Sequence, residues 1–370
     1  MASIRKRLFG PNKDQIAYLV DYRDQHGKRH VKTFATKKDA ERWKVDALHE
    51  VSQGTHTAAA ISKTVEEVWR LWITECDANG LEFSTVRQRQ QHLDHHVAVL
   101  IGSLRLSSLT APLIYQFDSK LRDMGRSVAM RRKVLTNIKT MLSFAQGRGL
   151  VAQNVARGCR IKTEDREAGG PMRPGVDFPT RSELNTLIDK AKGWWRPFIV
   201  TAIFTGMRQS ELRGLAWSNV DLDKGVIHVR QRASQWNRIG PPKSKAGKRD
   251  IPLTPMVVNA LKQWRLACPH SELDLVFPTQ HGEIMGMSTV VGRWSFFLRR
   301  GALPHYKFHA LRHGAASLFI EYLKWDAKKI MAVMGHASIQ LTFSTYGHLL
   351  GDLEADKDDM AKMEEAIRSA

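Results

Sequence analysis

The segment 157–175 is the strongest constraint on how this chain can fold. It contains the pairs Gly169-Gly170 and Pro174-Gly175, a further proline at position 171, and few apolar residues. Glycine and proline end helices and strands, and few contacts cross a boundary of this composition. A chain of 370 residues is also too long for one compact core. We therefore expect a multidomain protein with its main boundary in this segment.

The first part of the chain predicts a small β-sheet-plus-helix unit at residues 1–58. Residues 16–23 and 30–34 are rich in β-branched and aromatic residues and flank a turn-like stretch, so they predict a hairpin. Residues 5–9 are a candidate third strand. Thr36 is placed to cap a helix that follows the sheet.

An all-α domain is expected at residues 59–165. Thr64 and Glu67 form a capping-box pattern, and apolar residues then recur at helical spacing up to about position 153. The last helix, at residues 127–146, has one apolar stripe and one face that is nearly all cationic.

Residues 173–370 predict a mainly α domain with a small antiparallel sheet. Thr180 and Glu183 form a second capping box. Residues 226–231 alternate as a strand, and 250–253 end a partner strand. The final residues, 351–370, hold seven acidic and three basic residues, so this tail could cover its own domain or dock on a neighbouring protomer.

The net charge indicates a polyanionic partner. The chain has 57 Lys and Arg against 37 Asp and Glu, a formal charge of +20, and the surplus is spread along it. Nucleic acid is the commonest polyanion for such a protein, although a solvated cationic surface is the alternative. The candidate phosphate contacts are Arg5, Arg7, Arg23 and Arg29 on the sheet, and Arg126, Arg131, Arg132 and Lys133 on the last helix of the all-α domain.

Several function classes receive no support from the sequence. Cys76, Cys159 and Cys268 are far apart, so neither a disulfide nor a cysteine metal site is expected. There is no apolar run long enough to span a membrane, and the N-terminus lacks the apolar segment of a secretion signal. We expect a cytoplasmic protein without a membrane partner.

Five polar residues in the last domain suit chemistry on a phosphodiester: Arg208, His309, Arg312, His336 and Tyr346. Phosphodiester exchange places negative charge on two non-bridging oxygens, and the planar fork of arginine neutralises such charge well. His309 and Arg312 are three positions apart and would share a helix face. Tyr346 is the candidate nucleophile, and it needs nearby cations because its reference pKa is near 10.

A departing 5′-hydroxyl needs a proton, which a lysine on a turn can bring. Lys243 and Lys245 both fit this role, and Lys245 is also a candidate DNA contact. The spacing of His309 and His313 would also suit a zinc site, but the metalloprotease motif needs Glu where Ala310 stands.

Taken in order, these residues resemble the tyrosine site-specific recombinase family, of the phage-integrase type. Residues 205–215 resemble the family's first-arginine box, and 242–253 its lysine β-hairpin. Residues 309–313 match its H-x-L-R-H box, and 334–339 and 345–348 match the closing boxes. Two features depart from the pattern: Ser244 replaces the usual threonine after Lys243, and Tyr346 follows His336 by ten positions, a long interval.

The resemblance implies cleavage of one DNA strand by Tyr346, leaving a 3′-phosphotyrosine and a free 5′-hydroxyl. It assigns catalysis to Arg208, Lys243, His309, Arg312, His336 and Tyr346, with no metal and no cofactor. The partner would be double-stranded DNA with core and arm-type sites, bound by a homotetramer through a Holliday junction. Residues 1–58 would be the arm-binding unit and 59–165 the core-binding domain, and accessory DNA-bending proteins are candidate partners.

Two other functions are compatible with this fold pattern. A DNA-binding protein could keep the recombinase fold and act only in regulation or assembly, although intact site residues argue against a decayed site. A relaxing topoisomerase shares this kind of chemistry, but the small N-terminal sheet favours the recombinase. A metal-dependent nuclease would need clustered carboxylates, which the basic boxes lack.

Overall fold

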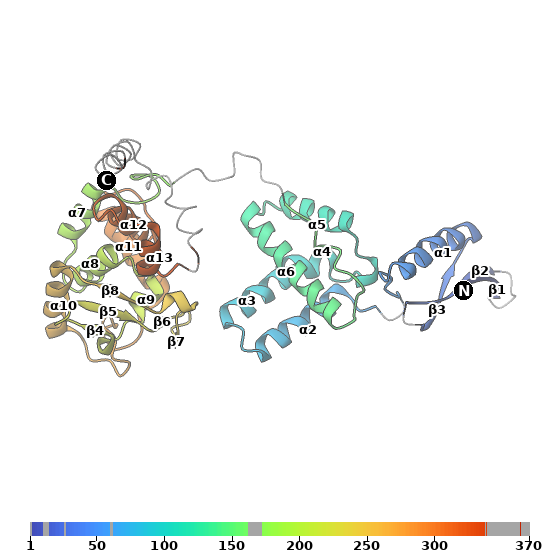
Figure 1. Ribbon diagram of the computed structural model, residues 1–370, viewed down its shortest axis with the longest axis horizontal. Helices are drawn as coiled ribbons and strands as arrows, with labels where there is room; N and C mark the ends of the chain where they lie inside the picture. The colour runs from blue at the N-terminus through green and yellow to red at the C-terminus, as the bar shows by residue number, and fades with distance from the viewer. Residues whose placement is uncertain are drawn as a thin grey trace. The chain divides into compact units, whose positions relative to one another are not determined.

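The computed structural model describes residues 2–9, 15–25, 27–59, 62–161, 172–336, 338 and 363. The chain divides into two compact units, Met1–Ala168 and Gly169–Ala370, and each is coloured by position along the chain in Figure 1. The expected fold class is confirmed: a small antiparallel sheet comes first, then a helical part, then a mainly α unit with a small sheet. The division of the first unit at residue 58 stays a prediction.

The first unit opens with an antiparallel sheet in the order β1-β2-β3. Its strands are β1 (Ser3–Phe9), β2 (Gln15–Arg23) and β3 (Arg29–Phe34), followed by α1 (Lys37–Ser52). The Thr36 side chain accepts a hydrogen bond from the Asp39 amide and so caps α1. Tyr22 and Trp43 meet edge to face and join β2 to α1.

The rest of the first unit is helical. Its helices are α2 (Val65–Ala78), α3 (Phe83–His92), α4 (Ala98–Ile101), α5 (Ala111–Asp123) and α6 (Val128–Gly147), and a π-helical turn (Leu93–Val97) joins α3 to α4. The capping box of Thr64 and Glu67 is present. Trp69 and Trp72 from α2 pack with the apolar stripe of α6 in one core. The cationic face of α6 is therefore left on the outside.

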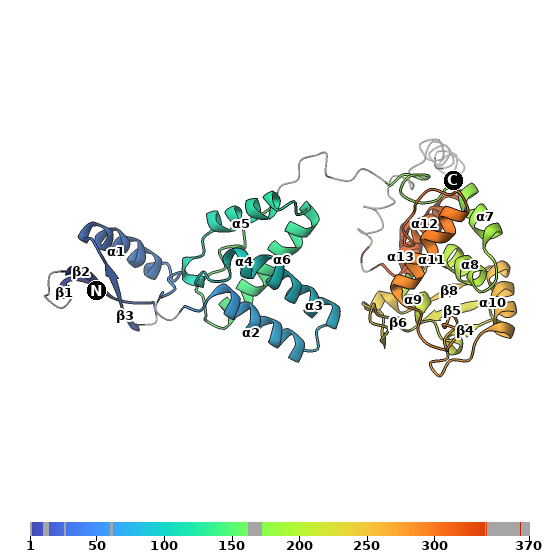
Figure 2. The ribbon, with the colours of Figure 1, turned by 180° about the vertical axis from the view of Figure 1, so that it is seen from behind.

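The second unit is built around one buried helix. Its helices are α7 (Arg181–Lys190), α8 (Trp195–Thr205), α9 (Gln209–Arg213), α10 (Pro255–Ala267), α11 (Met287–Arg300), α12 (Ala310–Glu321) and α13 (Ala327–Met334). Helix α8 is apolar almost all round and lies between α10 and α12, as Figure 2 shows. A helix of this pattern must be covered on every side.

A three-stranded antiparallel sheet completes the second unit, in the order β4-β5-β8. Its strands are β4 (Val220–Asp221), β5 (Val226–Val229) and β8 (Arg249–Pro252), and a two-stranded hairpin of β6 (Arg232–Ala233) and β7 (Ile239–Gly240) precedes β8. Val229 pairs with Arg249, so the expected pairing of these segments is confirmed. β4 and the short hairpin were not predicted.

Two further observations concern the described residues. No helix among them is long and apolar enough to cross a bilayer. Cys76, Cys159 and Cys268 are all free thiols.

Candidate active site

Arg208 owes its position to a tight turn between α8 and α9. Helix α8 ends at Gly206, whose φ of 60° is in the left-handed region that glycine adopts without strain. A Cβ at Gly206 would lie 2.8 Å from the Met334 sulfur and 3.3 Å from the Ala315 Cβ. The close approach of α12 and α13 therefore requires glycine here, and the chain then reverses to present Arg208 at the start of α9.

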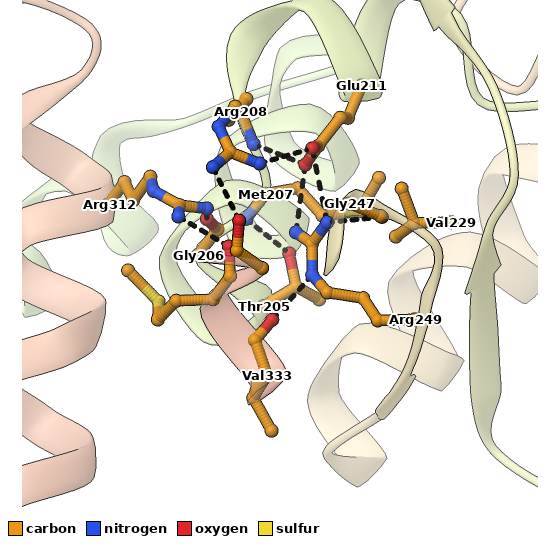
Figure 3. A network of polar contacts seen from close by, with 12 residues as sticks. Thr205, Gly206, Met207, Arg208, Glu211, Val229, Gly247, Arg249, Arg312 and Val333 are labelled. Atoms are coloured by element: carbon orange, nitrogen blue, oxygen red, sulfur yellow. Dashed lines mark hydrogen bonds and ion pairs between the residues drawn. The ribbon is translucent and has the colours of Figure 1, made fainter. Parts of the chain in front are cut away.

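The Arg208 side chain is held on two sides but is still 34% exposed. Its Nη1 donates to Glu211 Oε1 at 2.8 Å, and its Nη2 donates to the Gly335 carbonyl oxygen at 2.7 Å. Figure 3 shows Arg208 beside Glu211, with the contacts of this network drawn as dashed lines. Because a guanidinium carries five N–H donors, these two bonds orient the group and leave donors for an incoming anion.

Arg312 comes from α12 and is only 3% exposed. Its Nη1 donates to the Gly206 carbonyl oxygen at 2.7 Å, and its Nη2 donates to the Met334 carbonyl oxygen. The two arginines are therefore braced crosswise: Arg208 donates to Gly335, next to an acceptor of Arg312, and Arg312 donates to Gly206, in the turn that leads to Arg208. Figure 3 shows both guanidiniums beside the Gly206 turn.

A buried ion pair that the sequence did not predict lies beside these arginines. Arg249 contacts both carboxylate oxygens of Glu211, with Nη1–Oε1 at 3.1 Å and Nη2–Oε2 at 2.8 Å. The side chains are only 5% and 2% exposed. Burial opposes ionisation of Glu211, but the hydrogen bonds and charges of Arg249 and Arg208 together outweigh it and lower the pKa of Glu211 to about 2. Glu211 is therefore a carboxylate at neutral pH.

A sequence signal for this pair existed. In β8 the buried positions alternate, with Arg249 and Ile251 inward and Asp250 and Pro252 outward. An arginine at an inward position of a strand predicts a buried partner, because a buried charge must be paired. The identity of that partner depends on the tertiary fold.

Three histidines surround the arginines. His309 is the residue before α12, His313 lies one turn later with its ring 5.0 Å from that of His309, and His336 follows the glycine that ends α13. Burial, and then the nearby arginine charges, lower the pKa of His313 and of His336 to about 4. Burial, then the charges of His313, Arg312 and Arg208, lower the pKa of His309 to about 4 as well.

Four of the predicted residues come together in one place. The charges of Arg208 and Arg312 both act on His309 and on His336. The structure thus brings two arginines and two histidines together from segments that lie far apart in the sequence. Tyr346 lies outside the described residues.

The two candidate lysines lie in the connection between β7 and β8. Lys243 is in a bend, Lys245 begins a short 3₁₀ turn (Lys245–Gly247), and both side chains are exposed. The turn packs against Gly335, the residue before His336, because a Cβ on Gly335 would lie 3.0 Å from the Ala246 carbonyl oxygen. The choice between Lys243 and Lys245 as the catalytic lysine stays a prediction.

Some candidate DNA contacts of the first unit are bound to carboxylates of the protein, and others are exposed. Arg131 makes a two-point contact with Asp118, at 2.7 and 2.5 Å, and its side chain is only 11% exposed. Arg29 is bound to Asp21, with Arg5 3.9 Å from the same carboxylate. The other candidates are exposed: Arg7, Arg23, Arg126, Arg132 and Lys133. Arg131 is thus held within the fold by Asp118, and the assignment of the exposed residues as DNA contacts stays a prediction.

The sequence of this chain is similar to those of known proteins. Residues 178–351 match the Phage integrase family. The chain is 24% identical over 360 residues to a "Tyrosine recombinase XerC-like" protein of Caldanaerobacter subterraneus, covering 89% of this chain and 90% of that one. It is 31% identical over 231 residues to the tyrosine recombinase XerC of Xylella fastidiosa, covering 61% and 71%.

Solved structures share the fold. The Tn1549 transposon integrase in complex with transposon right end DNA has a TM-score of 0.68 at 18% identity and covers 82% of this chain and 100% of that one. A lambda integrase dimer bound to a COC′ core site has a TM-score of 0.59 at 18% identity, covering 90% and 92%.

These likenesses extend over both units and define the protein as a site-specific recombinase. The chain belongs to the phage integrase family of tyrosine recombinases. The resemblance drawn from its sequence boxes is thereby confirmed.

Proposed function

We propose that this recombinase cuts and rejoins double-stranded DNA through a covalent bond between Tyr346 and the 3′-phosphate. The observation that carries the proposal is that Arg208 and Arg312 lie close together, each held by a hydrogen bond to a backbone carbonyl group. Two fixed guanidiniums on one phosphate supply the electrostatic stabilisation that phosphodiester exchange needs. The catalytic set is Arg208, Lys243, His309, Arg312, His336 and Tyr346.

The arginines bind the non-bridging oxygens of the scissile phosphate. Arg208 retains outward N–H donors because its two described side-chain bonds go to Glu211 and Gly335. Arg312 is deeper, and its bonds to backbone carbonyls fix its orientation before DNA arrives. Because the donors are already in place, little reorganisation accompanies the build-up of negative charge on the phosphate.

The histidines act as neutral rings. Their lowered pKa values leave them uncharged at neutral pH, so each can donate one N–H to the phosphate and accept a proton at the other nitrogen. In the proposed step the Tyr346 oxygen forms a bond to phosphorus and loses its proton to His309 or to water. The bond from phosphorus to the 5′-oxygen breaks, and Lys243 protonates that oxygen.

The same groups make metal ions unnecessary in this proposal. Arg208 and Arg312 neutralise the charge that a divalent cation would otherwise neutralise. Within the described ranges, no group of three or more His, Cys, Asp or Glu side chains is arranged to hold a metal. The energy of the broken bond is kept in the phosphotyrosine, so no energy-rich cofactor is required for rejoining.

The proposed partner is DNA bound by a homotetramer. Two structural relatives were solved on DNA, the Tn1549 integrase with circular intermediate DNA and a lambda integrase tetramer bound to a Holliday junction. In this proposal residues 1–58 bind arm-type sites, residues 59–165 bind core sites, and residues 173–370 hold the catalytic pocket. Integration or excision of mobile DNA in the cytoplasm is the process that such an assembly serves.

A nicked DNA site tests the proposal. A nick close to the cleavage position lets the short 5′-hydroxyl fragment diffuse away, so the covalent protein–DNA complex accumulates. We expect the wild type to become attached to DNA and Tyr346→Phe to lose attachment. Tyr322→Phe is the matched control, because Tyr322 is an exposed tyrosine on the same unit, and its hydroxyl accepts a hydrogen bond from Arg181. Attachment in Tyr346→Phe, or its loss in Tyr322→Phe, would contradict the assignment.

A further inference from the structure

We propose that Arg249 is a positioning residue for strand cleavage, which orients the Arg208 guanidinium by fixing the Glu211 carboxylate between them. The inference rests on the proposed function, in which Arg208 binds the scissile phosphate. Neither the sequence boxes nor the comparisons assign this role to Arg249.

The geometry of the Arg249–Glu211 contact fixes the carboxylate in its plane. Each Nη of Arg249 donates to a different oxygen of Glu211, at 3.1 and 2.8 Å. A two-point contact of this kind removes rotation about the last bond of the glutamate side chain. The pair is also almost fully buried, so water does not compete for these oxygens.

The fixed carboxylate in turn holds Arg208. Glu211 Oε1 accepts from Arg208 Nη1 at 2.8 Å, and Oε2 accepts from the Arg208 backbone amide at 2.9 Å. Both oxygens are therefore shared between Arg249 and Arg208, and Figure 3 shows Glu211 between the two guanidiniums. If the carboxylate rotated, the bond to the Arg208 side chain and the bond to its backbone would be lost together.

Arg249 itself does not face the phosphate. Its Nε donates to the Val333 carbonyl oxygen at 2.6 Å, its Nη1 also donates to the Gly247 carbonyl oxygen at 3.0 Å, and its side chain is 5% exposed. Its donors are thus engaged inside the protein. Arg249 therefore acts through Glu211 and Arg208 rather than on DNA.

The same contacts connect three parts of the site. Val333 lies in α13, which leads to His336, and Gly247 ends the turn that follows Lys243. A Cβ on Gly335 would lie only 2.9 Å from Arg249 Nη1, so the packing around this group is tight. We infer that Arg208 reaches its cleavage geometry only when the lysine turn and the His336 segment are both in place.

The test is Arg249→Lys, which keeps the charge but loses the two-point contact. In single-turnover attachment to the nicked site at saturating protein, we expect cleavage at least ten-fold slower than wild type, with DNA affinity within two-fold. Arg213→Lys is the matched control. Arg213 is also a buried arginine, on the same helix as Glu211, but it donates to the carbonyl groups of Met285 and Ser234. We expect its cleavage rate to stay within two-fold of wild type.

A double variant separates positioning from general damage to the fold. If Arg249 acts through Arg208, then adding Arg249→Lys to Arg208→Lys slows cleavage less than two-fold further. Three results would each overturn the inference. The rate losses of Arg208→Lys and Arg249→Lys could multiply in the double variant, or Arg249→Lys could cleave at the wild-type rate. Arg249→Lys and Arg213→Lys could also lose cleavage equally. If Arg249→Lys does not fold, Arg249→Met with Glu211→Gln replaces it, because that pair leaves no unpaired buried charge. This folded double variant should also be at least ten-fold slow, and a wild-type rate overturns the inference.

The inference and the proposed function fail in different ways. Full cleavage by Arg208→Lys or by Tyr346→Phe would refute the proposed function. Loss of cleavage in both, with wild-type cleavage in Arg249→Lys, would refute only the role of Arg249.

Discussion

Arg208 donates a hydrogen bond of 2.7 Å to the carbonyl oxygen of Gly335, a residue 127 positions further along the chain. Arg312 donates a hydrogen bond, also 2.7 Å long, to the carbonyl oxygen of Gly206, which lies two residues before Arg208. Both acceptors are glycines that end helices with positive φ, 66° and 60°. The orientation of the two arginines is therefore set by backbone turns, and changes in those turns should affect catalysis.

Gly335→Ala should reduce both stability and cleavage. The left-handed φ costs a non-glycine residue about 1 kcal/mol, and the added Cβ would also press on Arg249 Nη1 and the Ala246 carbonyl oxygen. Gly193→Ala is the control, because Gly193 has a φ of 56° and nothing within 4 Å of the added Cβ. Chemical denaturation and attachment to the nicked site should show a larger loss for Gly335→Ala in both. Equal losses would show that strain alone, and not the contact with Arg249, matters.

The stability of the protein should fall on mild acidification. The pKa of His336 is about 4 in the folded state against 6.5 ordinarily, so between these values the unfolded chain binds a proton that the folded chain does not. This histidine's stabilising contribution is complete above pH 6.5 and falls by up to about 1.4 kcal/mol per pH unit down to pH 4. Glu211 adds a second loss below its ordinary value of 4.5, toward about 2.

Urea denaturation at several pH values measures this dependence. We expect His336→Gln to flatten the slope of the unfolding free energy between pH 6.5 and 4, because glutamine does not titrate. The slope is compared rather than the absolute stability, since the substitution also changes packing. Parallel slopes for the two proteins would rule out His336 as a source of the acid sensitivity.

Lys243→Ala should slow cleavage of ordinary DNA by roughly 10²–10⁴-fold, as loss of a general acid does. DNA with sulfur in place of the scissile 5′-oxygen should restore the rate, because a thiolate leaves without a proton. Lys245→Ala is the matched control, since Lys245 is exposed in the same connection, and its rate should stay near wild type on both substrates. Rescue of Lys245→Ala instead of Lys243→Ala would exchange the two assignments.

The outer face of α6 should contribute to the salt dependence of DNA binding. Arg132 is exposed, so Arg132→Ala should weaken binding and reduce the slope of log K against log salt by about 0.9. Arg131→Ala removes the two-point contact with Asp118 and should instead lower the unfolding free energy by about 1–3 kcal/mol. Titrations at several salt concentrations, with thermal unfolding alongside, separate the two effects. A change of slope in Arg131→Ala alone would reverse this division.

Local features of the sequence predicted most of the fold, because the forces that set them are local. The caps at Thr36, Thr64 and Thr180 act on amides within three residues, and all three begin helices in the structure. The hairpin of β6 and β7 was missed because two-residue strands are too short to show alternation. Periodicity has nothing to detect in such segments.

The residues of the candidate site were predicted from the sequence only in part. The arginines and histidines were singled out because their types and order match phosphodiester chemistry, and they lie close together in the structure, while their catalytic roles stay a prediction. The partnership of Glu211 with Arg249 was not found, because these residues are 38 positions apart and meet only through the packing of α9 on β8 and α13. The pairing of a buried charge is a property of the tertiary fold. The part of the site contributed by Tyr346 stays a prediction.

The crosswise bracing of Arg208 and Arg312 has a consequence for the time at which a newly made molecule becomes able to cut. A chain still on the ribosome that has been synthesised to residue 300 already contains Arg208, Glu211 and Arg249, but it lacks Arg312 and the carbonyl oxygens of Val333 and Gly335. Contacts between positions so distant in sequence form late. We therefore expect a chain that stops before residue 312 to lack both the Gly335 contact that orients Arg208 and the second arginine of the site.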